Sequence, residues 1–144
     1  MNDMTAIARE VFAADRYATE LTGIEIASAG DHEATCTLTL AAKHCNARGV
    51  AMGGVLYTLA DFAAAIAANS DCLGSGDLHW VSLDATVHYL SPAPLGARLT
   101  ARCHALKHGR TTALYQTIIE SLDNSKDALR ERTVAVVETT MMRV

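Results

Sequence analysis

The feature that most constrains this sequence is an apolar, alanine-rich segment at residues 53–69, GGVLYTLADFAAAIAAN. The segment begins with two glycines, Gly53 and Gly54, and contains one acidic residue, Asp61. An apolar run of this length predicts a helix that is buried on most of its sides. A membrane span needs about 20 apolar residues, so the segment is too short to cross a bilayer, and no membrane partner is expected.

The flanking segments have the alternation of half-buried strands. A first helix is predicted at 5–18, with Asn2 or Asp3 as its cap, and a short strand at 23–26. Strand-like runs follow at 33–40, 80–90, 97–106, 111–121 and 131–142, the last two separated by the polar stretch 123–129. One long helix followed by four consecutive strands predicts a single α+β domain over 1–144, with an antiparallel meander wrapped around the helix.

Composition excludes several classes of protein. The net charge of −4 argues against a general electrostatic grip on nucleic acid. The N-terminus lacks the basic and apolar regions of a signal peptide, so a cytoplasmic protein is expected. Neither the four cysteines nor the six histidines have metal-ligand spacing, and no metal or cofactor is expected.

The glycine pair has two interpretations. At a helix start, free N–H groups lie at the positive end of the helix dipole, and two glycines let a ligand approach them closely. Gly53 and Gly54 are therefore candidates for an oxyanion site. Alternatively, they only make a tight turn, which is the commonest use of glycine.

Asp61 is the second candidate. Aspartate is a mediocre helix former and is rarely buried without a partner, so its place among Leu59, Ala60 and Phe62 suggests a base or a nucleophile. Alternatively, Asp61 lies at a solvated edge or caps a neighbouring backbone group, and structural ion pairs also hold such residues.

Geometry links the two candidates. Asp61 lies seven residues after Gly54, so both are on nearly the same helix face, about 10 Å apart along the axis. A reacting carbonyl must lie about 3 Å from both groups. One chain cannot supply both, whereas two antiparallel helices across a two-fold axis can. The sequence thus predicts a homodimer with two composite sites.

Three further regions are weaker candidates, each with a structural alternative. Asn46 either donates its amide to a ligand or makes a turn. Ser82 and Asp84 are expected on one face of strand 80–90, lining the cleft or simply facing solvent. The basic turn formed by Lys107, His108, Gly109 and Arg110 either holds phosphates or is a solvated hairpin.

The string NARGVAMGGVLYTLAD at 46–61 resembles the signature of hotdog-fold thioesterases of the phenylacetate-degradation type, which has an Asn, a Gly, His-Gly-Gly and Leu-Ala-Asp. The resemblance covers most of the chain. It includes Phe12, Asp15, residues 23–25, Asn69, 81–84, 89–93, 95–96 and 109–110. It implies a hotdog fold and hydrolysis of acyl-CoA to an acid and free CoA. It also implies dimers, usually paired into homotetramers, with active sites at the dimer interface.

The resemblance also implies roles for individual residues. Gly53 and Gly54 would bind the thioester oxygen, and Asp61 of the partner chain would act as nucleophile or general base. Asn46 would position the thioester or the water, and Ser82 would assist Asp61. The positions matching CoA contacts are Asp84, Tyr89 and the stretch Lys107, His108, Gly109, Arg110, Thr111 and Thr112.

One departure from the signature affects the prediction. Met52 stands where the family has the histidine before Gly-Gly, so a polar contact to the thioester is lost. The alternative function is therefore a hotdog protein that binds acyl-CoA with weak hydrolysis or none. The sequence does not identify the acyl group, whose pocket is expected to involve Tyr57, Phe62, Trp80 and the loop at 71–78.

Overall fold

The computed structural model describes residues 3–123 and 130–144. Asn2 and most of the predicted polar stretch 123–129 lie outside these residues. The first helix, α1 (Met4–Phe12), is capped by the side chain of Asp3, which accepts a hydrogen bond from Thr5 N at 3.0 Å. Within the described residues, no helix is both long and apolar enough to cross a bilayer.

The predicted helix at 5–18 is wrong beyond Phe12. The chain turns there and continues as a short π-helix, η1 (Tyr17–Thr22). Phe12 and Ala18 are both buried, although residues six apart in one straight α-helix point in directions about 120° apart. The break therefore lets both side chains reach the core, while Ala14 is exposed.

Six strands form one antiparallel sheet in the order β1-β2-β4-β5-β6-β3. Their bounds are β1 (Glu25–Gly30), β2 (Glu33–Thr39), β3 (Trp80–Tyr89), β4 (Arg98–His108), β5 (Thr112–Asp123) and β6 (Arg130–Arg143). The predicted four-strand meander is wrong in one respect. Of the four strands in that meander, only β4, β5 and β6 lie side by side in chain order, because the loop after β3 carries the chain from the far edge of the sheet into its interior beside β2.

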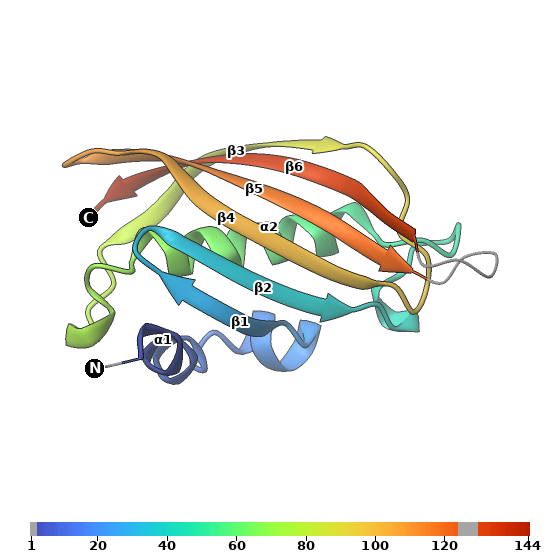
Figure 1. The fold of residues 1–144 in the computed structure, drawn as a ribbon, viewed down its shortest axis with the longest axis horizontal. Helices are drawn as coiled ribbons and strands as arrows, with labels where there is room; N and C mark the ends of the chain where they lie inside the picture. The colour runs from blue at the N-terminus through green and yellow to red at the C-terminus, as the bar shows by residue number, and fades with distance from the viewer. Residues whose placement is uncertain (1–2, 124–129) are drawn as a thin grey trace.

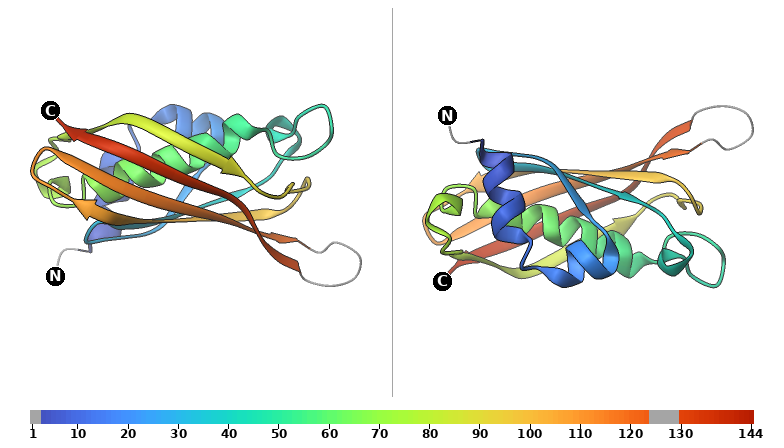
Figure 2. Two further views of the ribbon diagram at one scale, coloured as in Figure 1. Left: turned by 90° about the horizontal axis from the view of Figure 1, so that it is seen from above. Right: turned by 90° about the horizontal axis from the view of Figure 1, so that it is seen from below.

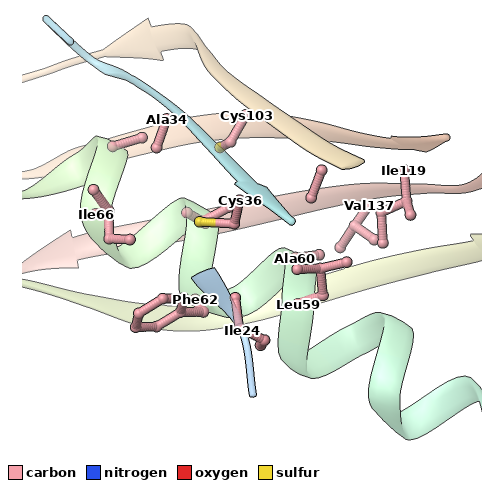
Figure 3. Close-up of a cluster of buried hydrophobic side chains, with 14 of the residues drawn as sticks. Ile24, Ala34, Cys36, Leu59, Ala60, Phe62, Ile66, Cys103, Ile119 and Val137 are labelled. Carbon is pink, nitrogen blue, oxygen red and sulfur yellow. The ribbon is translucent and has the colours of Figure 1, made fainter. Parts of the chain in front are cut away.

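The second helix, α2 (Gly53–Ala68), confirms the predicted central helix and packs against the sheet. Figure 1 shows the sheet curved over α2, with α1 beside β1. The close-up in Figure 3 shows Leu59, Ala60 and Ile66 of α2 among the inward side chains of the strands. The small alanines of this helix allow the backbone of α2 to approach the sheet closely.

Two residues expected to shape the acyl pocket are core residues instead. Phe62 is 2% exposed and meets the Phe12 ring edge to face at a centroid distance of 5.8 Å. Trp80 is 3% exposed. Neither side chain is open to a substrate in this chain, so both stabilise the fold rather than line a pocket.

One stripe of α2 is not covered by its own chain. Nine of its side chains are buried, whereas the stripe formed by Gly54, Tyr57, Thr58, Asp61 and Ala65 is exposed or half-buried. These positions recur at the three- and four-residue spacing of one helix face. The stripe therefore faces away from the sheet, and it carries both of the predicted reacting elements.

Asn69 fixes β3 to the C-terminal end of α2. The side chain is 1% exposed, and its Nδ2 donates to Ala65 O at 2.9 Å and Trp80 O at 3.1 Å. Its Oδ1 accepts from His79 N and Trp80 N, each at 2.9 Å. One buried amide thus satisfies the backbone at the start of β3 and sets where the rest of that strand lies along α2.

Replacing Asn69 with Ala is expected to lower the free energy of unfolding by about 2–4 kcal/mol. The expected loss is large because each buried backbone group left without a partner costs about 1–3 kcal/mol. Ser75→Ala, in the neighbouring exposed loop, is the control and should change stability by about 0.5 kcal/mol or less. Urea denaturation measures both, and equal losses in the two variants would contradict the role given to Asn69.

Candidate active site

The N-terminus of α2 presents unpaired backbone donors. Met52, the residue before the helix, is extended at φ −66° and ψ 138° and provides no side-chain cap. The N–H groups of Gly53 and Gly54 have no acceptor within residues 3–123 and 130–144. Both donors therefore point outward at the positive end of the helix dipole, where a developing negative charge is stabilised.

The two glycines have different surroundings. The Tyr89 hydroxyl donates to Gly53 O at 3.1 Å, and a Cβ added to Gly53 would lie 3.0 Å from the Tyr89 ring. A Cβ added to Gly54 would meet nothing within 4 Å. Gly53 is thus packed under Tyr89, whereas Gly54 lies on the open stripe of α2.

An open groove of about 380 Å³ lies beside these donors. Asn46, Gly53 and Tyr89 line it, together with apolar walls from Ala51, Leu56, Leu90, Pro92 and Ala93. Asn46 Oδ1 accepts from Arg48 N at 2.9 Å and Val50 N at 3.4 Å, which leaves its Nδ2 to donate. The predicted turn role of Asn46 and a ligand role are therefore compatible in one side chain.

Asp61 is held by Ser82. The Ser82 Oγ donates to Asp61 Oδ1 at 2.9 Å and also contacts Met141 Sδ at 3.5 Å. Asp61 is half-buried rather than enclosed, so its carboxylate is open to solvent on the stripe. The Tyr57 phenol, one helical turn earlier, has a raised pKa because of partial burial and the nearby charges of Asp61 and Tyr89.

Ser82 and Asp84 do not share a face, contrary to the expectation from strand alternation. Ser82 pairs with buried Met141 and Asp84 pairs with Thr140, so one extra residue, Leu83, bulges between them. A bulge reverses the alternation of a strand. Ser82 therefore points to α2, whereas Asp84 lies on the outer face of the sheet.

The turn between β4 and β5 differs in a similar way from the expected basic hairpin. Ala105 pairs with Tyr115 and Lys107 with Leu114, which places a bulge at Leu106. The bulge turns His108 inward, where its side chain is 16% exposed and its Nδ1 lies 2.8 Å from the Tyr115 hydroxyl. Lys107 and Arg110 are exposed, so the His108 ring does not join them in an open basic surface.

This turn and the Gly53 donors lie at opposite ends of α2. His108 contacts Asp71 and Trp80, just beyond the C-terminus of the helix, whereas Asn46 and Tyr89 surround its N-terminus. Both views in Figure 2 place the β4–β5 turn at the opposite end of α2 from the start of the helix. Since α2 has 16 residues, the two ends are about 24 Å apart.

The family model described as the Thioesterase superfamily matches residues 48–128, which include both glycines, Asp61 and Ser82. The match covers more than half of the chain. The chain belongs to the thioesterase superfamily.

Individual relatives agree with this assignment. The chain is 33% identical to acyl-coenzyme A thioesterase 13 of Homo sapiens over 117 residues, which are 78% of this chain and 81% of the relative. It is 33% identical to the acyl-coenzyme A thioesterase PaaI of Escherichia coli over 74% of this chain and 73% of that protein. The solved structure of the E. coli PaaI protein superimposes with a TM-score of 0.79 at 27% identity, covering 98% and 96% of the two chains. The predicted hotdog fold is confirmed.

Some residues around the site were not expected from the sequence. Leu56 and the loop from Leu90 to Ala93 form the groove wall; residues 89–93 were expected as part of the family resemblance, but no role in a groove was predicted for them. His32, which stacks on His108, gave no signal because it lies in a turn far from the recognised motif. A contact between two turns that are far apart in the sequence cannot be predicted from the local spacing of residues.

The stability of the protein is expected to fall with acid partly through His108. Burial, followed by repulsion from His32, lowers the pKa of His108 below its ordinary 6.5, against the opposing attraction of Asp71 and Asp31. Arg143 lowers it further. On acidification, the His108 imidazole therefore takes up a proton at a higher pH in the unfolded chain than in the folded one. This difference lowers the stability of the folded protein as the pH falls below 6.5.

The His108→Asn variant should lose this component, because Asn does not titrate. Its Tm should therefore fall less than that of the wild type between about pH 7.5 and about pH 5.5. Thermal denaturation at both values measures the difference. His88→Asn, at an exposed position on β3, is the control and should keep the wild-type pH dependence; parallel curves for all three proteins would contradict the expectation for His108.

Proposed function

We propose that this protein is an acyl-CoA thioesterase that hydrolyses a thioester to a carboxylic acid and free CoA. The observation that carries the proposal is the placement of Asp61 and the free Gly54 N–H on one uncovered face of α2. A carboxylate and an oxyanion donor are the two elements that acyl transfer from a thioester needs. The relatives named as acyl-coenzyme A thioesterases support the choice of substrate class.

In the proposed reaction the thioester oxygen binds the N–H groups of Gly53 and Gly54. Asp61 either removes a proton from water, whose oxygen then attacks the carbonyl carbon, or attacks that carbon itself to form an anhydride that water opens. In both routes the C–S bond breaks and the CoA sulfur leaves as thiolate. Ser82 holds one Asp61 oxygen, which leaves the other free to react. Asn46 positions the thioester or the water through its free Nδ2.

The distance between Gly54 and Asp61 along α2 supports a site built from two chains. Gly54 and Asp61 are seven residues apart, about 10 Å along α2, and a single carbonyl cannot reach both. Two copies of α2 running antiparallel across a two-fold axis bring Asp61 of one protomer beside Gly54 of its partner, twice. The same arrangement brings the distant Lys107–Thr112 turn of one chain toward the partner's Gly53.

The exposure of the edge strand β3 supports a dimer contact along this edge of the sheet. It forms one edge of the sheet, and its outer side chains Val81 and Leu83 are 44% and 58% exposed. An uncovered edge with apolar side chains is a template for pairing with another chain. A homodimer joined through β3 and the open stripe of α2 would cover both, and further pairing into tetramers stays a prediction.

The CoA moiety is proposed to bind along the same interface. Lys107 and Arg110 are exposed cations suited to its phosphates, with Thr111 and Thr112 beside them. Tyr89 borders the groove at Gly53. Asp84, on the outer face of β3, contacts CoA only if the ligand passes over that face.

The second candidate function is acyl-CoA binding with weak hydrolysis or none. It is favoured by Met52, which is 56% exposed beside Gly53 where the family has a histidine. A thioether is only a weak acceptor and cannot donate to the thioester oxygen. Tight CoA binding without thiol release from short, long and aromatic acyl-CoAs would favour this candidate.

Replacing Asp61 with Asn is expected to lower thiol release by at least about a hundredfold, because Asn cannot act as a base or form the anhydride. The change keeps the size of the side chain and an oxygen that can accept from Ser82. A spectrophotometric thiol assay measures the rate, and gel filtration checks that assembly is retained. Undiminished turnover would remove Asp61 from the mechanism.

The Gly53 N–H is tested by comparing Gly53→Pro with Gly53→Ala. Both add a Cβ under Tyr89, but only Pro removes the N–H, and the extended Met52 already suits a residue before proline. The Pro variant is expected to have a kcat about a hundred- to a thousandfold below that of the Ala variant. Equal rates would show that this donor is not used.

Mixing Gly53→Pro chains with Asp61→Asn chains tests the composite site. If each site takes Asp61 and Gly53 from different chains, half of the random dimers contain one intact site, and about a quarter of the wild-type activity returns. If one chain supplied both groups, every site would stay defective and no activity would return. Chains are mixed under mild denaturant and refolded, with each variant refolded alone as the control.

A further inference from the structure

Three aromatic side chains from different strands and turns meet behind the β4–β5 turn. The His32 and His108 rings stack with centroids 3.9 Å apart and planes inclined by 24°. The Tyr115 hydroxyl lies 2.8 Å from His108 Nδ1 and 3.3 Å from His32 Nδ1. These three side chains, called the His32–Tyr115–His108 cluster, lie far from Gly53, at the other end of α2.

The phenol of Tyr115 is the centre of this cluster. Its side chain is fully buried, and burial raises its pKa, so it keeps its one proton. That proton can be donated to one acceptor at a time, among His108 Nδ1, His32 Nδ1 and the Ala67 carbonyl at 3.5 Å, and the phenol oxygen can accept from an imidazole N–H. The hydroxyl therefore lies within hydrogen-bonding distance of both histidines and links them.

His32 is held in place from several sides. Its backbone is left-handed at φ 56°, an uncommon conformation for a residue other than glycine. Its N–H donates to Ser70 Oγ at 2.9 Å, and its carbonyl accepts from Ala105 N at 3.1 Å. The ring is thus a fixed support against which His108 packs, anchored to both β4 and the end of α2.

His108 transmits this support to the turn. The bulge at Leu106 turns the ring inward, and Gly109 N donates to Thr112 O at 2.9 Å directly after it. Arg143 N donates to Thr111 O at 2.9 Å on the other side of the turn. The direction of the neighbouring Lys107 and Arg110 side chains therefore depends on where the His108 ring is fixed.

We propose that the His32–Tyr115–His108 cluster is a positioning element that fixes the Lys107–Thr112 turn for binding the phosphates of CoA. The inference rests on the proposed function, because it assigns the turn to CoA. The cluster itself touches neither the thioester nor Asp61, so it acts on CoA affinity and not on the chemical step. Within the described residues no group of three metal-binding side chains is placed to hold a metal ion.

Acid should weaken this element. Protonating His108 puts a positive charge 3.9 Å from the second ring and removes the Nδ1 acceptor when the phenol donates to it. The charged groups facing the pair are Asp31 at 3.5 Å from His32, Asp71 at 4.0 Å from His108, and Arg143. The carboxylates only partly offset the repulsion because both are solvent-exposed.

The test compares Tyr115→Phe with Thr117→Val. Tyr115→Phe removes the hydroxyl and keeps the ring in the core, whereas Thr117 lies two residues along the same strand, buried on the same face but outside the cluster. The first change is expected to raise the Kd for free CoA and the KM about three- to tenfold, the equivalent of one hydrogen bond, with kcat within about twofold. The control should leave all three unchanged.

A second variant, His32→Asn, tests the stack without backbone strain, because Asn tolerates a left-handed conformation. It is expected to weaken CoA binding in the same direction and to increase amide hydrogen exchange across residues 107–112. In both variants the weakening of CoA binding between about pH 7.5 and about pH 5.5 should be smaller than in the wild type. Isothermal titration with CoA itself measures affinity at both values.

The outcomes separate the two proposals. A wild-type protein that binds no CoA and releases no thiol would overturn the proposed function and the positioning role together. A wild type that binds CoA, with Tyr115→Phe and His32→Asn binding it equally well, would overturn the positioning role alone. A loss confined to kcat would also overturn it, since the cluster would then act on the chemistry.

Discussion

The packing of α2 into the curved sheet is the constraint on which the rest of the molecule depends. Nine side chains of this helix are buried, most of them alanines, and they bring its backbone close to the strands. The close packing leaves one uncovered stripe, and the glycines and Asp61 lie on it. Asn69 then ties β3 to the end of the same helix, which places Ser82 within hydrogen-bonding distance of Asp61. The candidate site therefore follows from how one helix is buried.

The sequence was sufficient to predict α2 almost to the residue, because an apolar run between a glycine pair and Asn69 leaves few alternatives. It also predicted six strands and the sheet around the helix, although the first strand, expected at 23–26, is Glu25–Gly30. The first helix was overextended, since the apolar spacing continues past Phe12 while the chain does not. The place of β3 beside β6 was missed because strand order depends on long-range pairing, which local alternation does not encode.

The errors at the candidate site have one common physical cause. Strand alternation predicts which side chains share a face only while the register is unbroken. Single extra residues at Leu83 and Leu106 reverse the alternation, so Asp84 turns outward and His108 turns inward. Neither bulge has a glycine or proline beside it that would mark it in the sequence. The bulge at Leu83 also places Ser82 and Tyr89 both toward the helix, although residues seven positions apart on a regular strand lie on opposite faces.

Gly54 offers the strongest reason to expect something on the open stripe. A Cβ at this position would meet no atom of its own chain, and glycine in a helix is less favourable than alanine by about 1 kcal/mol. Nothing in the isolated fold compensates for that loss, whereas Gly53 is at least required by the Tyr89 ring above it. A glycine is useful at an open position when another surface must approach the backbone closely, and a partner helix and a bound thioester are the two candidates. The proposed composite site would bring both of them to the same N–H groups, together with the carboxylate of the partner.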